Sequence, residues 1–599
     1  MIQEDKKLPL KKAVAMALGR EACDLALIHA NVVDVFGRTV LQDRTVLVAG
    51  GQILAVVPSA QCPKPNAKEI FDCQHRYLTP GLTDAHVHIE STLLTPENFA
   101  RAVLPCGTTC VIADPHEIAN VAGISGIQYM LDASENLPVH ILLAMPSCVP
   151  CTPFEDAGAS LDADAIASLM GHERICALGE VMNYPGLLAG DDDLLAKVEK
   201  AEALGKVADG HCPSLSGLEL HAYAGCGIRA DHETTEPDLI RERIEAGMYV
   251  FIREGSAAQG LEQMLPAVNS NNAGRFCFCT DDLHAEDILS SGHINSILAK
   301  AVKLGLPAAT AVAMATLNPA QCFGLAHRGA VAPGYKADLV LMEDLVDFKP
   351  CMVWSDGACV VNGSTISGFR KPVAVPEEIL HSMHVAELAP DCLKLPVPSG
   401  RARVIKINPF SLVTDSIVMD VITDEEGNLA TRKNKDLCKI AVIERHKGLN
   451  RIGLGILKGY FYSGLLLGGA VATSISHDSH NIVVAGRTDE GMLLAARTVA
   501  EMGGGLCMVR DGKVVSSLSL PVAGLMSQEG AESVAKGLKV LETIARQCGC
   551  CEGVTPLTTL AFMALCVIPS LKVNTRGLFD VNAFKFVPVD AGDDNTDCI

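Results

Sequence analysis

Residues 78–325 alternate short apolar segments with longer amphipathic stretches, and this rhythm constrains the fold more than any other feature. The short segments have the length of buried strands, whereas 191–206 and 288–305 have the apolar spacing of helices. The expected strands are 81–86, 109–114, 139–145, 175–181, 206–210, 227–231, 248–252 and 275–280. Eight strands, each followed by a crossover, within about 250 residues predict an α/β fold of the (β/α)8-barrel type. An open doubly wound sheet would need a glycine-rich turn after an early strand, and the sequence has none there.

Two β-rich stretches flank the expected barrel. Residues 24–57 alternate apolar runs with turns, and a similar stretch covers residues 330–364. Segments placed in this way on both sides of a barrel can pair into one small domain. The expected domains are a small β-sandwich domain of residues 1–77 with 326–387, a catalytic barrel of residues 78–325 and, after a proline-marked linker, a C-terminal α/β domain of residues 401–599.

The composition is that of a large acidic protein. Hydrophobic residues make up 49% and charged residues 20% of the 599 residues, which excludes a disordered chain. The net charge of −21 repels phosphate backbones, and aromatic residues make up only 4%, too few for base-stacking platforms. We therefore expect no nucleic-acid partner.

The cysteines indicate a reducing compartment. There are 23 of them along the whole chain, unlike the short, even-numbered framework of a secreted disulfide-rich protein. The sequence contains no apolar run of about 18 residues and no apolar signal segment. We expect a cytoplasmic protein without a membrane partner, and we also expect a homo-oligomer, a dimer. The CxxC pair of Cys148 and Cys151 would need a second pair of ligands to hold zinc.

Potential metal ligands gather at the ends of the expected strands. His86 and His88 close the first strand, and residues two apart share a face, so both imidazoles project from its carboxyl end. Barrel enzymes carry their chemistry at that end. Four more residues at other strand ends could join them: Glu180, His211, His232 and Asp281. A lone buried histidine or acid is usually a hydrogen-bonded core group, but six such residues at five strand ends favour a metal centre. Imidazoles with carboxylates suit manganese, iron or zinc, and this number suffices for two ions.

Further polar residues follow strands at the same rim. His116 and Glu117 come after the second strand, and Arg253 and Ser256 come after the seventh. They can contact substrate or support the ligands, but a helix cap or an ion pair with acidic neighbours would leave the same pattern. Segment 476–481 of the third region is rich in histidine. Its histidines could form an auxiliary rim site, or they could stabilise a turn.

Several long motifs resemble a known family. The segment PGLTDAHVHIES and the closing ATLNPAQCFGL and GAVAPGYKADLVL resemble the amidohydrolase superfamily. More narrowly, the chain resembles the bacterial adenine deaminase family. The motifs that carry this resemblance are VIADPHEIANV (111–121), GEVMNYPG (179–186), DGHCPSLSG (209–217), ADHETT (230–235), REGSA (253–257), TDDLHAEDIL (280–289), AVIERHKGLNRIGLG (441–455), SHDSHNIVVAG (476–486) and PVAGLMS (521–527). The resemblance covers most of the chain.

The resemblance implies a ligand set and two metal ions. The family pattern makes six residues ligands: His86, His88, Glu180, His211, His232 and Asp281. Glu180 would bridge the two ions, where many relatives in the superfamily carry a carboxylated lysine. The family implies manganese or iron as the working metal, with Mn²⁺ expected first and Fe²⁺ or Zn²⁺ as alternatives. The sequence alone does not choose between them.

The resemblance also implies a reaction, the hydrolysis of adenine to hypoxanthine and ammonia in purine salvage. A metal-activated hydroxide would attack purine C6, and Asp281 would carry the proton from water to the departing amino group. Glu233, or second Glu117, would protonate the ring nitrogen. The expected substrate-binding residues are His116, Arg253 and Ser256.

Three other interpretations share features of this sequence. A hydrolase of a cyclic amide or of another aminated heterocycle is the alternative enzyme, and a non-catalytic small-molecule-binding barrel is the alternative outside enzymes. The zinc nucleobase deaminases carry H-x-E followed by P-C-x-x-C. His88-Ile89-Glu90 fits the first element, but three residues separate Cys106 from Cys110, so we reject this class.

Overall fold

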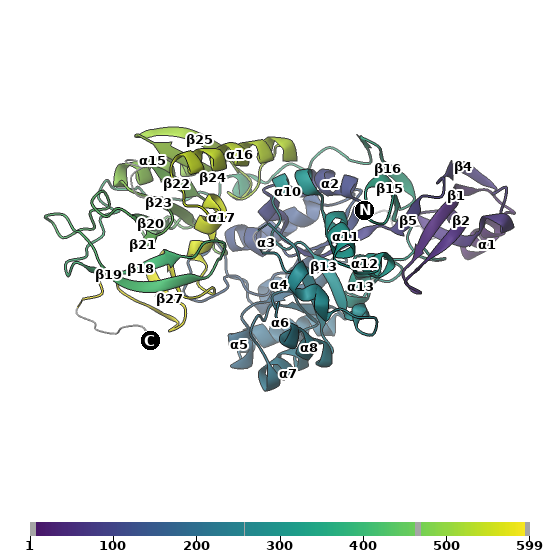
Figure 1. The fold of residues 1–599 in the computed structure, drawn as a ribbon, viewed down its shortest axis with the longest axis horizontal. Helices are drawn as coiled ribbons and strands as arrows, with labels where there is room; N and C mark the ends of the chain where they lie inside the picture. Colours follow the sequence, from purple (N-terminus) through teal and green to yellow (C-terminus); the bar gives the residue numbers. More distant parts are fainter. Residues whose placement is uncertain (1–7, 257, 462–468, 593–599) are drawn as a thin grey trace.

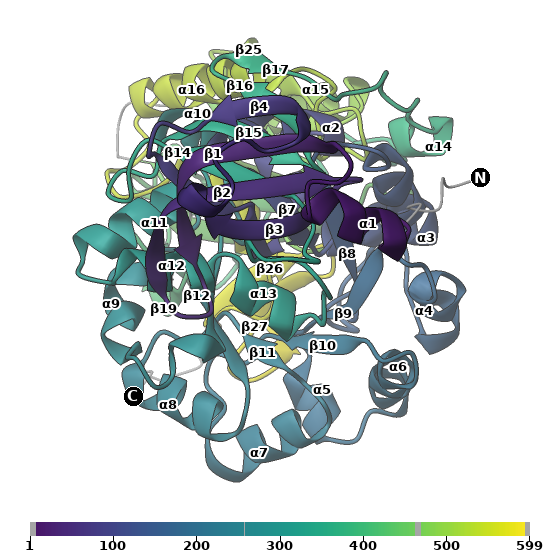
Figure 2. The same ribbon diagram turned by 90° about the vertical axis from the view of Figure 1, so that its right-hand side faces the viewer.

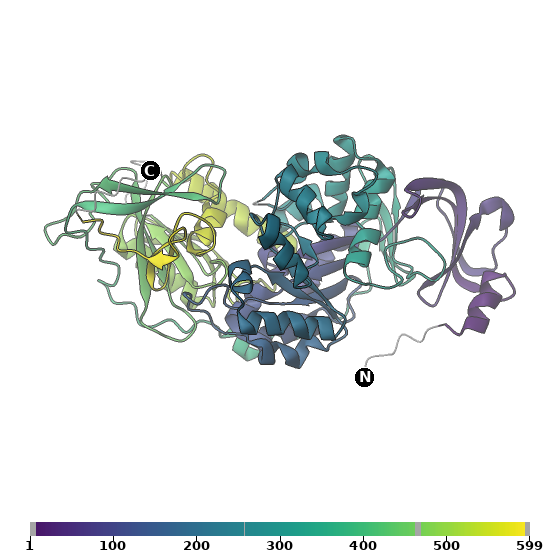
Figure 3. The ribbon, with the colours of Figure 1, turned by 90° about the horizontal axis from the view of Figure 1, so that it is seen from below.

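The computed structural model describes residues 8–256, 258–461 and 469–592. Three parts follow one another along its long axis, as Figures 1 and 3 show. They are an N-terminal sheet, a central barrel and a C-terminal sheet. The barrel therefore contacts one sheet at each end, and the two ends have different neighbours.

The barrel is built from eight parallel strands. They are β6 (Leu82–Val87), β7 (Thr108–Ala113), β8 (His140–Met145), β9 (Ile175–Val181), β10 (Val207–Gly210), β11 (Ala230–Asp231), β12 (Tyr249–Arg253) and β13 (Phe276–Cys279). They form two arcs, β6 to β10 and β11 to β13. Parallel bridges between Ala208 and Ile228 and between Val87 and Asp281 join the arcs at both seams. The predicted fold class is confirmed, and each expected strand overlaps an observed one.

Apolar residues explain the barrel's closure. Strands β6, β7 and β13 are buried along their whole length, as expected of parallel strands that are covered on both faces. Apolar residues of neighbouring strands, among them Ala85, Ile112, Ala144 and Ala177, form one buried cluster. Helices cover the outside, and Figure 2 shows α6, α7 and α8 around its lower edge.

The barrel helices follow the predicted pattern with one difference. They are α2 (Pro96–Val103), α3 (His116–Ala133), α4 (Ala163–Met170), α5 (Tyr184–Leu188), α6 (Asp192–Ala203), α7 (Gly217–Gly225), α8 (Pro237–Glu245), α9 (Leu261–Met264), α10 (Ala285–Ser291), α11 (Ile294–Lys303), α12 (Ala308–Met314) and α13 (Leu317–Cys322). The predicted helical stretch 288–305 is two helices, because Gly292 adopts φ +105° between α10 and α11. Apolar spacing continues through this break, so periodicity alone did not reveal it.

Segments from both sides of the barrel pair into the N-terminal sheet. Its strands are β1 (Cys23–Asp34), β2 (Thr39–Ala49), β3 (Gln52–Pro58), β4 (Ala67–Asp72), β5 (Tyr77–Pro80), β14 (Leu339–Met342), β15 (Pro350–Ser355), β16 (Ala358–Asn362) and β17 (Thr365–Ile366). The antiparallel pair β5–β14 joins the two segments. The sheet encloses its own apolar core, and the rings of Phe71 in β4 and Trp354 in β15 are 5.7 Å apart. Helix α1 (Leu10–Ala17) packs at its edge.

The C-terminal sheet has eight strands in the order β19-β18-β21-β20-β23-β22-β24-β25. They are β18 (Arg401–Ile407), β19 (Thr414–Asp420), β20 (Leu437–Ile443), β21 (Ile452–Lys458), β22 (Ala470–Thr473), β23 (Ile482–Gly486), β24 (Gly505–Arg510) and β25 (Lys513–Ser519), followed by β26 (Leu571–Asn574), β27 (Gly577–Asp580) and β28 (Lys585–Phe586) in a small second sheet. The helices are α14 (Glu377–Leu380), α15 (Asp489–Glu501), α16 (Ala531–Gln547) and α17 (Pro556–Ala561). Helix α15 packs on the sheet through Met492, Ala496 and Val499.

Asp156, in a loop after β8, connects the barrel to the C-terminal part. Its carboxylate accepts hydrogen bonds from Arg451 at 2.8 Å, from Arg576 at 2.9 Å and from Thr575 at 2.6 Å. Its carbonyl oxygen accepts a bond from the Asn481 amide at 2.7 Å. Because the loop follows the carboxyl end of a barrel strand, these bonds hold the C-terminal part over that end of the barrel.

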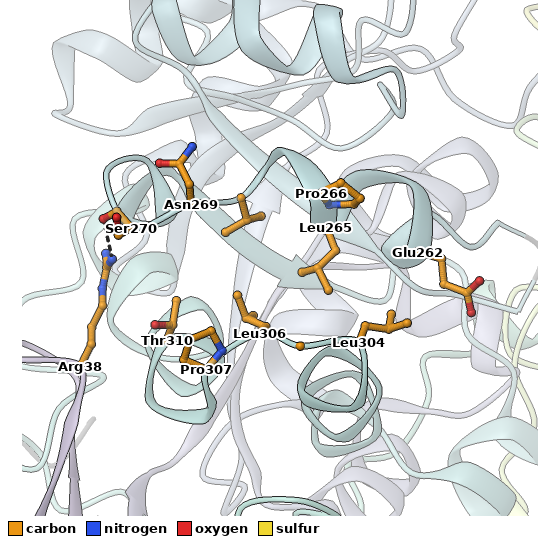
Figure 4. Close-up of a pocket in the computed structure, with 12 residues that line it drawn as sticks. Arg38, Glu262, Leu265, Pro266, Asn269, Ser270, Leu304, Leu306, Pro307 and Thr310 are labelled. Carbon is orange, nitrogen blue, oxygen red and sulfur yellow. Dashed lines mark hydrogen bonds between the residues drawn. The ribbon is translucent and has the colours of Figure 1, made fainter.

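A cavity of ≈ 550 Å³ lies at the other end of the barrel, between the N-terminal sheet and the segments that precede β13 and α12 (Figure 4). Arg38 reaches across it and donates a hydrogen bond to the Ser270 carbonyl at 3.2 Å. Leu265, Leu304 and Leu306 supply apolar walls. This cavity contains none of the predicted ligands. Among the described residues, no helix combines the length and apolar character needed to cross a membrane.

Candidate metal centre

The six predicted ligands converge at the carboxyl ends of the barrel strands. Nε2 of His86 and Nε2 of His88 lie 3.2 Å apart, and Asp281 Oδ1 lies 3.7 Å from the first and 3.1 Å from the second. All three side chains are buried. Two residues of β6 and one that follows β13 therefore form one half of the cluster, at the seam where these strands meet.

Glu180, at the end of β9, connects this half to the other two histidines. Its Oε1 lies 3.3 Å from His88 Nε2. Its Oε2 lies 3.3 Å from His232 Nε2 and 2.7 Å from His211 Nδ1. The imidazoles of His86 and His232 stack at 4.2 Å between ring centroids. A single carboxylate thus faces both halves of the cluster, one oxygen toward each.

The geometry and chemistry of the donor set fit divalent cations. Two ligand atoms that each lie about 2.1 Å from one ion, at angles between 90° and 110°, are about 3.0–3.4 Å apart. The close approach of the Nε2 atoms of His86 and His88 falls in this range, and neutral imidazoles facing each other need a shared cation or proton between them. Mixed nitrogen and carboxylate donors suit first-row transition metals.

Burial and charge oppose each other throughout the cluster. Burial disfavours the Glu180 carboxylate, but hydrogen bonds with His211, His232 and His88 lower its pKa well below the ordinary range. Burial likewise disfavours charge on His232, but Glu180 raises the pKa of its ring to about 9. In the metal-free protein, protons compensate the buried carboxylates. A cation would take over that compensation, so metal binding releases protons.

The Asp209 carboxylate and the backbone carbonyl of Asp114 orient two of the predicted ligands, a role that the sequence patterns did not predict. Asp209 Oδ2 lies 3.0 Å from His86 Nδ1, and the Asp114 carbonyl oxygen lies 2.9 Å from His88 Nδ1. Asp114 also accepts a bond from the Glu180 backbone N–H at 2.9 Å. With each Nδ1 occupied, each Nε2 points into the site. The signal available in the sequence was an aspartate repeated one or two residues before histidines at the strand ends: Asp84, Asp114, Asp209 and Asp231.

Arg253, at the end of β12, bridges the predicted acid Glu233 and the ligand Asp281. Its guanidinium donates to Glu233 Oε1 and, over 2.8 Å, to Asp281 Oδ2. Burial opposes ionisation of Asp281, but the Arg253 charge and the bond from His88 hold its pKa well below the ordinary range. Asp281 adopts φ +57°, and its N–H donates to the His86 carbonyl, so its carboxylate turns toward the histidines at the seam.

The other predicted residues occupy different positions. His116 begins α3, and its Nδ1 lies 3.4 Å from Glu180 Oε1, beside the ligands. Glu117 is buried and lies 3.1 Å from the Ser91 hydroxyl. Ser256 follows β12, and its hydroxyl contacts Asp287 and accepts the His284 backbone N–H at 2.8 Å, where α10 begins.

A pocket of ≈ 510 Å³ lies directly above the cluster. His88, Glu180, His211, His232 and Asp281 form its floor, together with Glu117, Glu233 and Arg253. The C-terminal part supplies the opposite wall. That wall is mainly apolar and consists of Leu412, Phe562, Leu565, Ile568 and Phe584, with His477 and Asp478 beside them. The pocket is thus closed by two parts of the chain, polar on one side and apolar on the other.

Comparisons with known proteins cover both parts of this pocket. Residues 77–360 match the model of the amidohydrolase family, and residues 411–585 match the adenine deaminase C-terminal domain. An adenine deaminase of Nitratidesulfovibrio vulgaris (strain DP4) is 46% identical over 581 residues, which cover 97% of this chain and 99% of that protein. Adenine deaminase 2 of Carboxydothermus hydrogenoformans is 44% identical, covering 97% and 99%, and an adenine deaminase of Halalkalibacterium halodurans is 39% identical, covering 96% and 98%. Since identity at this level extends over nearly the whole chain, the protein belongs to the adenine deaminase family of amidohydrolases.

Proposed function

We propose that this protein hydrolyses adenine to hypoxanthine and ammonia. One observation carries the proposal: six imidazoles and carboxylates, five of them buried, converge at the floor of a pocket whose opposite wall is mainly apolar and includes Phe562 and Phe584. Such a floor suits metal-assisted hydrolysis, and such a wall suits the faces of a planar heterocycle. The relatives named above as adenine deaminases support the choice of adenine.

The proposal includes two divalent ions, with Mn²⁺ favoured and Fe²⁺ or Zn²⁺ as alternatives. The residues that would hold them are His86, His88, Glu180, His211, His232 and Asp281, and Glu180 would face both ions because its two oxygens face different histidines. When bound, the ions activate water as a nucleophile and stabilise negative charge that develops during the reaction.

Asp281 is the proposed proton carrier. As water adds to C6 of adenine, the Asp281 carboxylate accepts a proton from it. The same carboxyl then gives this proton to the departing amino group, which leaves as ammonia. Arg253 holds the second oxygen of Asp281 at 2.8 Å, so the first oxygen stays directed toward the reacting centre. Proton transfer of this kind typically contributes about 10²–10⁴ in rate.

The purine ring must also gain a proton while water adds, and the proton left on the C6 hydroxyl returns to the same donor as the C6=O bond forms. The proposed donors are Glu233 and Glu117, both of which line the pocket. Glu233 accepts a hydrogen bond from Arg253. Glu117 is buried against the Ser91 hydroxyl and faces His477 of the C-terminal part. His116, Arg253 and Ser256 remain the proposed substrate-binding residues; of these, Arg253 and His116 line the pocket.

Ammonia release tests the proposed function. We expect manganese-loaded protein to release ammonia from adenine, and to act on adenosine far more slowly because the family resemblance is to base-specific enzymes. The panel should also contain cytosine, guanine and a cyclic amide. Release from one of these but not from adenine would refute the proposal in favour of another aminated heterocycle or a cyclic amide. Binding without turnover of any compound would favour a non-catalytic barrel.

We also propose that the protein is a cytoplasmic homodimer that acts in purine salvage and has no nucleic-acid or membrane partner. The proposed domains are residues 1–77 with 326–387, residues 78–325 and residues 401–599. The acidic net charge of −21 supports the absence of a nucleic-acid partner. Sizing of the purified protein checks the dimer, and limited proteolysis checks the domain boundaries.

A further inference from the structure

The loop between β22 and β23 brings His477 into the wall of the pocket, opposite Glu117 at the start of α3. We propose that His477 is a positioning residue, which holds the Glu117 carboxylate at the adenine pocket and so couples the C-terminal part to the chemical step. The inference rests on the proposed function, because it concerns a group proposed to move a proton to the purine ring.

The contact between the two residues is direct and buried. His477 Nδ1 lies 3.2 Å from Glu117 Oε1, and both residues are buried. Ser91 donates a hydrogen bond from its hydroxyl to the same Glu117 oxygen at 3.1 Å. Ser91 also lies 2.5 Å from Asp282 Oδ1. Glu117 is therefore held by one barrel group, Ser91, which also contacts Asp282, and by one group from the C-terminal part.

The electrostatic setting gives this contact its importance. Burial alone would favour a protonated Glu117, but the charge of His477 and the hydrogen bond with it lower the pKa of this carboxyl well below its ordinary range. Glu90 is a second buried acid near the start of α3, and its carboxylate accepts the Ile118 backbone N–H at 3.2 Å. A carboxylate held in this way can pass a proton to the purine ring only if a neighbour supplies that proton, and His477 Nδ1, 3.2 Å away, would be the supplier.

His477 itself is held in place by packing. Its ring stacks on Phe562 with centroids 4.3 Å apart and planes 20° apart, and its backbone N–H donates to the Ala561 carbonyl at 3.1 Å. Phe562 and His477 both line the pocket. The ring therefore serves two separable purposes: one face packs on Phe562, and Nδ1 reaches Glu117.

A third metal ion is a poorer explanation of this cluster. Glu117, His477 and His480 bring potential ligand atoms within 4.8 Å of one another. However, the Ser476 backbone N–H donates to His480 Nδ1 at 3.2 Å, so this nitrogen carries the lone pair. Nε2 of the neutral His480 ring then carries the hydrogen and has no lone pair to offer an ion. The cluster suits a carboxylate flanked by donors.

Two substitutions at position 477 separate the two purposes. His477→Phe keeps a ring that can stack on Phe562 but removes the donor to Glu117. His477→Asn places an amide near the position of Nδ1 but removes the stack. We expect His477→Phe to lower kcat for adenine by about 10- to 100-fold, while KM and metal content change less than about threefold. We expect His477→Asn to recover at least about a third of the lost kcat. His381→Phe, at an exposed histidine, is the control.

A double-mutant cycle with Glu117→Gln completes the test. If the two residues act together, His477→Phe should lower kcat little further in the Glu117→Gln background. Equal kcat in His477→Phe and the unchanged protein, or a larger loss in His477→Asn than in His477→Phe, would overturn the inference while the proposed function stood. The melting temperatures of the same four proteins test the contact without substrate. Additive changes in melting temperature would overturn the inference even if adenine proved not to be the substrate.

Discussion

Asp209 Oδ2 lies 3.0 Å from Nδ1 of His86, on the opposite side of the ring from the Nε2 that faces the other ligands. Both side chains are buried. The carboxylate fixes the tautomer of His86 and its orientation, and it makes the ring a better donor to a cation. Asp209 would therefore support the proposed metal centre from a position two residues before the predicted ligand His211.

We expect Asp209→Asn to lower the affinity for divalent metal by about 10- to 100-fold, the usual effect of losing such a support. Asparagine keeps the size of the side chain but loses the charge that draws the Nδ1 proton. Competition with a chelator of known affinity measures the change. Asp238→Asn is a suitable control because this side chain is exposed on α8. An unchanged affinity in Asp209→Asn would show that the contact is not needed to orient His86.

Removing the metal should abolish turnover and leave a recoverable protein. Prolonged dialysis against a chelator should stop ammonia release, and about two equivalents of Mn²⁺ per chain should restore it. The single substitutions His86→Ala and Glu180→Ala should each lower the metal content measured in the purified protein. Glu180→Ala should have the larger effect, because its two oxygens face both halves of the ligand set. Full metal occupancy in either variant would contradict the ligand assignment.

Asp281→Asn should separate chemistry from binding. Asparagine keeps one coordinating oxygen but cannot accept and return a proton at neutral pH. We expect kcat to fall at least about a hundredfold, with a smaller change in KM and with metal still bound. The neighbour Asp282 is unsuitable as a control because it is hydrogen-bonded to Ser91 beside the pocket. Near-normal turnover of Asp281→Asn would transfer the role of proton carrier to another group, with Glu233 tested next.

The barrel and the position of the proposed ligands at its strand ends were predictable because each rests on a local signal. Parallel strands that are buried on both faces appear as short, continuous apolar runs, as β7 and β9 do. Each ligand follows such a run immediately, so it lies at the carboxyl end whatever the pairing of the strands. The ends of the observed strands differ from the expected ones by a few residues at most, except at β11, where only two residues pair.

The rest of the site depends on contacts between distant residues, which no local pattern reports. His477 reaches Glu117 across 360 positions of the sequence, and the apolar pocket wall comes from loops around Phe562 and Phe584. An aspartate before a histidine, such as Asp209, reveals its partner only when the strand order is known. Ser256 shows the converse: it follows a strand as a ligand would, but its hydroxyl is engaged at the start of α10.

Because the C-terminal part closes the pocket, we expect a substitution at a contact outside the pocket to weaken substrate binding. Asp156 accepts bonds from Arg451, Arg576 and Thr575 and so holds the C-terminal part against the barrel. We expect Asp156→Ala to raise KM for adenine several-fold and to lower the melting temperature, because hydrogen bonds to charged groups contribute about 1.5–3 kcal/mol each before allowance for exposure. Metal content should stay unchanged. Asp164→Ala, at an exposed carboxylate, is the control, and an unchanged KM in Asp156→Ala would refute the role of this contact.

Lys572, in β26, should make stability depend on pH. Its side chain is fully buried, and burial lowers the pKa of its ammonium group to about 7 from an ordinary value of 10.5. Below about pH 7 the folded and unfolded chains both carry the proton, so the folded state bears the full cost of the buried charge. Between about pH 7 and pH 10.5 the unfolded chain binds the proton at Lys572 and the folded chain does not. Raising the pH through this window therefore stabilises the folded state with respect to this group.

The variant Lys572→Met isolates this effect. Methionine fills a similar volume without a charge, although it gives up the hydrogen bond from Nζ to the Leu412 carbonyl at 3.0 Å. We expect Lys572→Met to be more stable than the unchanged protein at pH 6, by on the order of a few kcal/mol. The difference in unfolding free energy should shrink steadily as the pH rises from about 7 toward 10. Chemical denaturation of both proteins at each pH measures the difference, which cancels the titration of the buried cysteines that they share. A difference that stays constant with pH would mean that Lys572 keeps its ordinary pKa in the folded protein.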